Sequence, residues 1–400
     1  MIICSQIKHN TLKLWSAQTI SATGDAVYQL ALVWIILDIT ESTFATGLIA
    51  MSAYLPAIVF GVFAGVLVDH YSRIKLMLIS NFSQAVVVAI IPVLLFIDIK
   101  IGLIIGVLAF LRASFGSLFP PALNAFLPEI FPKDKLIKIN SLIATSGQFA
   151  YFTGPVIAGI LLNIMSIEIL FAWDALSFLL AAIVLMTIHY PDKLKESTIG
   201  SRLQELRSGF TYLKANRSIR LLIILTIINN IFIMGPAIVG IPIMIKYHLL
   251  GSASDFAFVE AGMALGMLIG TFFMYHFSNQ FKNGYLLLLG ILWDGLTYAL
   301  FFWVKSVPMA LCIIMFHGMG IPIITVSRTT ILQKYAPNRY HGRLFAMVHL
   351  AVSGMTAIST ALVGMISEVI SIHIVFLLFG IGGTFTGLIG ILYSDIQKFE

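Results

Sequence analysis

Two residues of opposite charge lie deep inside long apolar segments, where a charged side chain is energetically costly. Asp25 falls in the middle of the apolar segment 12–37, and Arg112 falls inside the segment 100–127. A charge at the centre of a bilayer costs about 2.5–3.5 kcal/mol on insertion scales. Such residues usually face the protein interior or a water-filled path and mark the route of an ion or a substrate. We therefore interpret both as functional, and a buried ion pair that only fixes helix register is the alternative.

The chemistry these residue types could perform is proton exchange. A carboxylate that alternates between an arginine and a proton is a simple coupling device, and Asp25 with Arg112 fits it. Gln29 lies four residues after Asp25 and so shares its helix face. His317, inside the segment 308–331, is a second titratable candidate. Its alternative is a histidine that a neighbouring side chain merely satisfies.

Three further acidic residues fall inside apolar segments, namely Asp174, Glu260 and Asp294. Asp174 and Glu260 lie only seven and six residues from the predicted outer ends of their segments, so we expect water to reach them. Asp294 lies deeper. We interpret all three as structural.

The composition places the chain in a membrane. Hydrophobic residues make up 59% and charged residues 10%, whereas a soluble domain carries about 25% charged residues. Cys4 and Cys312 suggest neither a disulfide nor a redox site. The sequence has no Walker-type loop, no HExxH, no Cys/His cluster with metal-ligand spacing and no nucleophile elbow. We expect no enzyme, no cofactor and no metal.

Apolar segments of about 20 residues match the roughly 30 Å hydrocarbon core of a bilayer. The sequence predicts an all-α membrane protein with twelve transmembrane helices in two six-helix halves, residues 1–189 and 219–400, joined by a polar linker at 190–218. The predicted spans are 12–37, 44–68, 76–97, 100–127, 139–162, 167–189, 219–245, 254–278, 284–304, 308–331, 341–366 and 371–394.

Lysine and arginine predict the orientation, because cytoplasmic loops are enriched in them. With the N-terminus inside, 20 of the 24 basic residues lie in inner segments, and the outer loops hold only Lys100, Lys246 and Lys305. Both termini are therefore predicted to be cytoplasmic. The net charge of +6 follows from this bias and indicates no nucleic-acid partner.

The linker carries an apolar stripe with helical spacing, formed by Ile199, Leu203, Leu206, Phe210 and Leu213. It predicts an amphipathic helix on the inner membrane surface or against the two halves. A partner-binding helix is the alternative.

A weak internal repeat supports two related halves. The segment from Asn124 to Pro132 is similar to the segment from Thr329 to Pro337, and each precedes a polar turn. Paired halves with sites near the middle of the bilayer are a transporter design.

The segment between the second and third spans resembles the signature of the major facilitator superfamily. It carries Gly65, Asp69, Arg73 and Lys75, with His70 and Ser72 where the family usually has arginine and glycine. The resemblance implies a latch that closes the two halves in the outward-open state. The two departures imply a weaker or pH-sensitive latch.

Two more motifs resemble the same superfamily. The run from Arg112 to Gly116 is similar to its fourth-helix arginine motif, which is linked to proton coupling. Gly154, Pro155 and Gly159 are similar to its fifth-helix motif, which is typical of antiporters, with Ala158 replacing a customary glycine.

Within the superfamily the chain is similar to the macrolide-efflux and enterobactin-exporter-like group. The carrying segments run from Tyr54 to Asp69, from Phe119 to Pro128 and from His341 to Phe345. The resemblance implies that helices 1, 4, 7 and 10 line a central cavity. Its candidate residues are Asp25, Tyr28, Gln29, Arg112, Asn229, Asn230 and His317.

The resemblance implies a proton-coupled exporter of an amphiphilic small molecule, such as a drug or a siderophore, by alternating access. An importer, a lipid or lysolipid transporter and a non-transporting receptor remain alternatives. The expected partners are a small-molecule substrate, protons and the lipid bilayer. The expected location is the bacterial inner membrane, and we expect a monomer.

Overall fold

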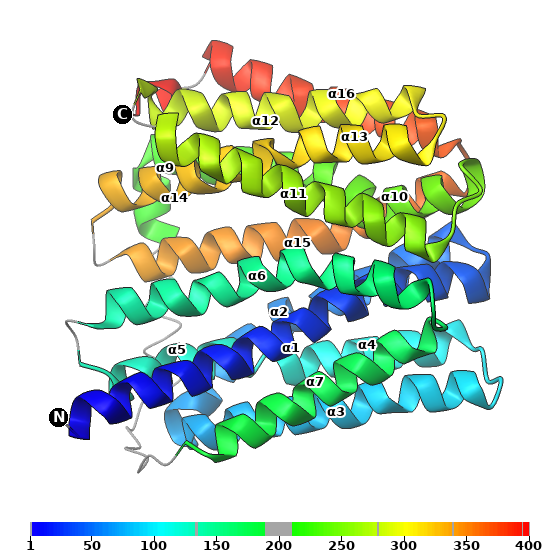
Figure 1. The fold of residues 1–400 in the computed structure, drawn as a ribbon. Coiled ribbons are helices and arrows are strands. Elements are labelled where there is room, and N and C mark those ends of the chain that lie inside the picture. Colours follow the sequence, from blue (N-terminus) through cyan, green and yellow to red (C-terminus); the bar gives the residue numbers. More distant parts are fainter. Residues whose placement is uncertain are drawn as a thin grey trace. The chain divides into compact units, whose positions relative to one another are not determined.

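The computed structural model describes residues 2–132, 135–188, 210–277, 280–337, 340–393 and 395–399. These residues are nearly all helical and contain no strand (Figure 1). The chain divides into two compact units. The first comprises Met1–Thr40 and Ser52–Ile199, and the second comprises Glu41–Met51 and Gly200–Glu400.

The helices follow the predicted spans closely, except that the first begins ten residues earlier. In the first half of the chain they are α1 (Ile2–Thr40), α2 (Thr43–His70), α3 (Arg73–Phe96), α4 (Gly102–Gly116), α5 (Phe119–Ile130), α6 (Leu136–Leu162) and α7 (Glu168–Met186). In the second half they are α9 (Arg217–Gly235), α10 (Ile241–Ile243), α11 (Ala253–Phe277), α12 (Asn283–Leu300), α13 (Val307–Gly318), α14 (Gly320–Tyr335), α15 (His341–Ser367) and α16 (Ile372–Tyr393).

Eleven stretches of the described helices are long and apolar enough to cross a membrane. The predicted span outside this set is α6, which is 27 residues long but carries Ser146, Gln148 and Thr153. Most of the predicted amphipathic linker helix lies outside the described residues, which resume as a helical turn at Phe210.

Two spans predicted as single helices are each split in two. The fourth breaks between α4 and α5, and the tenth breaks between α13 and α14. Pro120 and Pro121 stand in the first turn of α5, and Pro322 stands in the first turn of α14. Proline is tolerated there because the main-chain N–H groups of the first turn have no partner within the helix, so the N–H that proline lacks is not needed. A π-helical turn, Pro236–Gly240, follows α9 and begins with a proline.

The same packing pattern recurs inside each unit. In the first unit α1 packs against α6 and α7, while α3 packs against α7, α4 and α5. In the second unit α9 packs against α15 and α16, while α12 packs against α16, α13 and α14. The helices correspond one to one in chain order, so the packing agrees with the internal repeat.

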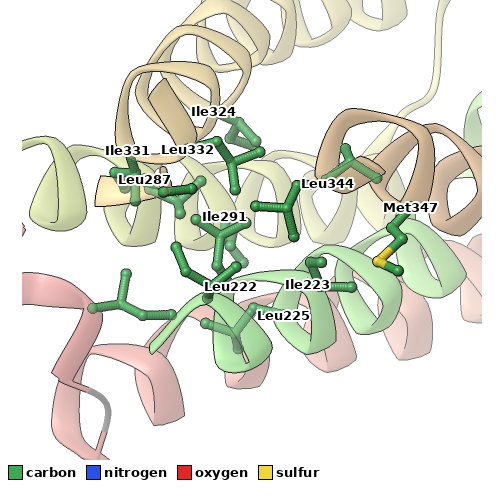
Figure 2. Close-up of a cluster of buried hydrophobic side chains, with 14 of the residues drawn as sticks. Leu222, Ile223, Leu225, Leu287, Ile291, Ile324, Ile331, Leu332, Leu344 and Met347 are labelled. Carbon is green, nitrogen blue, oxygen red and sulfur yellow. The ribbon is translucent and has the colours of Figure 1, made fainter. Parts of the chain in front are cut away.

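An apolar core positions the helices of the second unit (Figure 2). Leu222 of α9, Ile291 of α12, Leu332 of α14 and Leu344 of α15 meet in one buried cluster. A fully buried leucine or isoleucine side chain contributes about 1.5–3 kcal/mol when it leaves water. This cluster holds α9, α12, α14 and α15 together.

Candidate functional site

Arg112 is the centre of a buried charge cluster in the first unit. Its Nη2 contacts Oδ1 of Asp25 on α1 and lies 3.1 Å from Oδ2 of Asp174 on α7. Its Nε donates a second bond to the same Asp174 oxygen at 3.3 Å. The structure therefore brings Asp25 and Arg112 together, and it adds a second carboxylate that the sequence had not joined to them.

The two carboxylates have different access to solvent. The side chain of Asp174 is 0% exposed, that of Arg112 is 9% exposed, and that of Asp25 is 42% exposed. The expectation that water reaches Asp174 is therefore wrong, because α1 and α3 both pack against α7 and the Asp174 side chain is enclosed. Gly24 permits this packing, since a Cβ there would lie 2.6 Å from Oδ1 of Asp174.

Aromatic rings complete the cluster. The guanidinium carbon of Arg112 stands 3.8 Å from the ring centre of Tyr28 and 5.3 Å from that of Phe178. A cation over an aromatic face gains about 0.5–2 kcal/mol. Tyr28 is buried, so it orients Arg112 and does not present an exposed surface to a substrate. Gln29, in contrast, is exposed and accepts a long hydrogen bond of 3.5 Å from the Tyr54 hydroxyl.

A second buried polar cluster lies in the second unit. Asn229 of α9 donates a hydrogen bond of 3.1 Å from Nδ2 to Oδ2 of Asp294 on α12. Nδ1 of His317 on α13 lies 2.8 Å from the Thr297 hydroxyl and 3.8 Å from Oδ1 of Asp294. The structure thus brings together two predicted cavity residues, Asn229 and His317, through an aspartate that the sequence had suggested only as structural.

Two other polar residues of the second unit, Asn230 and Glu260, do not belong to this cluster. Asn230 is buried and returns its amide to the main-chain oxygen of Thr226 at 2.7 Å, on its own helix. Glu260 on α11 is partly buried. Neither has a described contact with Asp294 or His317.

The segment 65–75 ends α2 and starts α3. Ser72, which replaces the usual glycine, is the N-cap of α3 and accepts a hydrogen bond of 3.3 Å from the Lys75 main-chain N–H. Arg73 is buried and pairs with Glu129 of α5 at 3.5 Å. The backbone of Asp69 lies in the last turn of α2.

The fifth-helix motif lies on α6 where it meets α1. A Cβ on Gly154 would lie 2.4 Å from Cβ of Ala26, so only glycine permits this approach. Pro155 follows inside the helix. The main-chain oxygen of Gly159 accepts a bond of 2.7 Å from the Asn163 amide.

The described residues contain no group of three or more His, Cys, Asp or Glu side chains that could hold a metal ion.

Residues 5–400 match the family described as transmembrane secretion effector. The chain belongs to this family, a branch of the major facilitator superfamily of transporters. The match extends over almost the whole chain. It confirms the predicted superfamily and the all-helical membrane fold, and it makes the chain a transporter and not an enzyme.

Individual relatives agree with this placement. Macrolide efflux protein A of Streptococcus pyogenes is 24% identical, over 98% of this chain and 99% of its own. The multidrug efflux pump Tap of Mycolicibacterium fortuitum is 22% identical, over 97% of this chain and 96% of its own. The crystal structure of a D-xylose–proton symporter superposes with a TM-score of 0.77 at 14% identity, over 98% of this chain and 99% of its own. That structural likeness shows the fold alone.

Sequence reasoning missed the two central acidic partners, Asp174 and Asp294. Both were visible as carboxylates inside apolar spans, which is the signal that had singled out Asp25. The pairs Arg112–Asp174 and His317–Asp294 could not be predicted, because the two residues of each pair lie on different helices and meet only when α7 and α12 pack against their neighbours.

Proposed function

We propose that the chain is a proton-coupled exporter, an antiporter that exchanges protons for an amphiphilic small molecule such as a drug or a siderophore. It works by alternating access of two halves, 1–189 and 219–400, joined by the linker 190–218. The observation that supports this most is the contact of one guanidinium, Arg112, with two carboxylates, Asp25 and Asp174.

The charges of this cluster do not balance without a proton. With both carboxylates ionised, one arginine leaves a net charge of −1, and an uncompensated buried charge is costly. A proton on Asp25 leaves Arg112 and Asp174 as a neutral pair. Asp25 is the partly exposed member and Asp174 the enclosed one, so Asp25 exchanges the proton while Asp174 holds the arginine in place. A cationic group of a substrate could compete with that proton.

The driving force is adequate for export. One charge moving through 100 mV supplies about 2.3 kcal/mol, and a tenfold gradient costs about 1.4 kcal/mol. One proton would thus sustain roughly a tenfold to hundredfold gradient of a neutral substrate.

Export is favoured over import by the resemblance of Gly154, Pro155 and Gly159 to an antiporter motif, and by the efflux proteins among the relatives. We place the protein in the bacterial inner membrane as a monomer with both termini in the cytoplasm, following the distribution of lysine and arginine. An importer or lysolipid transporter of the same fold, or a receptor that binds without transport, is the alternative.

We further propose that Gly65, Asp69, Arg73 and Lys75 serve as the conformational latch. The support is their match to the family signature and the position of Asp69 in the last turn of α2. The ion pair between Arg73 and Glu129 anchors the start of α3 within the first unit.

Everted membrane vesicles test the direction and the coupling together. Their cytoplasmic face points outward and respiration acidifies their interior. An exporter accumulates radiolabelled erythromycin, a cationic dye or a catecholate siderophore, and a protonophore abolishes the accumulation. Vesicles without the protein provide the background. An importer releases the preloaded probe instead, whereas a receptor retains an amount of probe that does not respond to the protonophore.

A further inference from the structure

The polar cluster of the second unit has no part in the coupling scheme proposed above. It consists of Asn229 on α9, Asp294 and Thr297 on α12, and His317 on α13, and all four residues are buried. Four polar side chains enclosed together need a complete set of hydrogen bonds, because a buried polar group without a partner costs about 1–3 kcal/mol.

The Thr297 hydroxyl is a hydrogen-bond partner of His317. Its oxygen lies 2.8 Å from Nδ1 of the imidazole, and the tautomer of His317 decides which of the two atoms donates. The hydroxyl also lies within hydrogen-bond distance of the main-chain oxygens of Trp293, at 2.8 Å, and Asp294, at 3.0 Å.

Asp294 lacks one hydrogen. Its Oδ2 accepts the Asn229 amide, but its Oδ1 is buried with no hydrogen-bond donor among the described residues. Oδ1 faces Nδ1 of His317 at 3.8 Å. A proton on Oδ1 supplies the hydrogen that this arrangement lacks.

Few other charges face the pair. Arg328 of α14 interacts electrostatically with Asp294. The ring of Tyr298, on α12, lies 4.4 Å from the His317 ring. On α11, which packs against α13, the buried stretch carries Glu260. The titratable residues of α16 are His373 and Tyr393, at its two ends.

We propose that Asp294 and His317 form a proton-binding pair, so that the second half has a proton site of its own. Uptake of one proton converts the Asp294 carboxylate to the acid, and Nδ1 of His317, 3.8 Å from Oδ1, influences how readily this proton binds. The pair gains one positive charge. Proton binding follows from this geometry alone, whereas the claim that this proton is transported rests on the proposed antiport.

Infrared difference spectra of the purified full-length protein, recorded between neutral and acidic pH, test proton binding without any substrate. The wild type should show a protonated carboxylic acid band that Asp294→Asn lacks. His317→Gln removes the imidazole but keeps a hydrogen-bonding group, and it should move the pH midpoint of that band. Asp255→Asn is the control, because Asp255 caps the exposed start of α11 by accepting from the Ser252 N–H at 2.7 Å.

These spectra test whether Asp294 and His317 bind a proton. If both Asp294→Asn and His317→Gln leave every carboxylic acid band unchanged in size and midpoint, the pair binds no proton and the inference is overturned. Loss of the band in Asp294→Asn, with a shifted midpoint in His317→Gln, supports it. If one variant fails to fold, the other still decides through the midpoint or the band.

The ratio of internal to external probe concentration in everted vesicles tests whether this proton is coupled to transport. Two protons per cycle double the slope of the logarithm of the ratio against the proton-motive force. Asp294→Asn should halve that slope, so that a hundredfold accumulation falls to about tenfold at the same force. An unchanged slope with a lost band would mean that the site binds a proton without coupling. Absence of any proton-driven movement in the wild type would refute the antiport and leave the spectroscopic result standing.

Discussion

Arg112 and His317 occupy equivalent positions in the two halves of the chain. Each is the eleventh residue of its helix, α4 from Gly102 and α13 from Val307. The offset between them, 317 − 112 = 205, is also that between Asn124 and Thr329 in the internal repeat, 329 − 124.

Each of these residues faces a buried aspartate from another helix of its own unit. The partner of Arg112 is Asp174, and the partner of His317 is Asp294. The two basic groups differ in chemistry, because a guanidinium stays charged in proteins whereas an imidazole exchanges its proton near neutral pH. The first half therefore has a fixed positive charge at this position, whereas the second half has a group that can also be neutral.

Asp25→Asn should abolish proton-driven export and leave the protein folded. The amide keeps the shape of the side chain but cannot exchange a proton, and Asp174 still pairs with Arg112. Export in everted vesicles and thermal unfolding in detergent measure the two effects. Asp98→Asn is the control, since Asp98 lies in an exposed turn beside Lys100. Export at the wild-type rate in Asp25→Asn would show that Asp25 is structural.

Arg112→Ala should destabilise the protein more than the double change Arg112→Ala with Asp174→Asn. Removing one partner leaves an uncompensated buried charge, typically at a cost of 3–5 kcal/mol. Combining Arg112→Ala with Asp25→Asn should restore less stability than combining it with Asp174→Asn, because Asp25 is partly exposed and Asp174 is enclosed. Double-mutant cycles of thermal or denaturant unfolding measure both couplings. A zero coupling with Asp174 would mean that the contact contributes nothing to stability.

The membrane class, the helix positions and the superfamily could be predicted from sequence because each depends on local patterns. Apolar length defines a span, and the motif at 65–75 lies in one continuous stretch. The pairing of Asp25 with Arg112 was predictable as well, since the two are the deepest opposite charges.

The partners Asp174 and Asp294 could not be assigned from sequence for a physical reason. Depth along a helix does not say which face of the helix a neighbour covers. The exposure of Asp174 depends on close packing at Gly24, and the contacts of Asp294 depend on the approach of α9 and α13. Helix breaks before α5 and α14 were also missed, although the prolines that mark them were visible.

Gly154→Ala should destabilise the contact of α6 with α1. The added Cβ would lie 2.4 Å from that of Ala26, so the helices must separate, at a cost of about 1–3 kcal/mol. Gly147→Ala on the same helix is a matched control, since nothing lies within 4 Å of its Cβ. Alanine is a better helix former than glycine by up to about 1 kcal/mol, so Gly147→Ala should be neutral or stabilising. Equal midpoints of thermal unfolding for the two variants would contradict this account.

Asp69→Asn should raise the inward-open fraction and lower turnover. A carboxylate that meets the N-terminus of another helix gains about 0.3–2 kcal/mol, which shifts populations by up to ~30-fold. If the latch closes on the start of α15 near His341, the loss of the Asp69 charge favours the inward-open state. Labelling of single cysteines on the two membrane faces measures the populations, with Asp98→Asn as control. Unchanged labelling would show that this segment is no latch.

Glu368→Gln should weaken a contact between the end of α15 and the start of α2 in a way that depends on pH. Oε1 of Glu368 accepts hydrogen bonds from the Phe44 main-chain N–H at 2.9 Å and the Ser42 hydroxyl at 2.6 Å. These bonds hold the pKa of Glu368 below its ordinary value of 4.5. Nearby, the Thr43 hydroxyl donates to the Gly364 main-chain oxygen at 2.9 Å, which keeps the two helices in close contact.

The sign of the pH effect follows from the lowered pKa. The carboxylate contributes its full stabilisation above pH 4.5 and loses it as the pH falls through the lower folded pKa. Glu368 is exposed, so we expect the contribution to be below about 1 kcal/mol. The unfolding midpoint of Glu368→Gln should therefore lie slightly below that of the wild type at neutral pH and meet it in acid. Glu41→Gln, an exposed carboxyl beside the contact, should show no such convergence. A difference between Glu368→Gln and wild type that persists unchanged in acid would mean that the charge of Glu368 does not hold this contact.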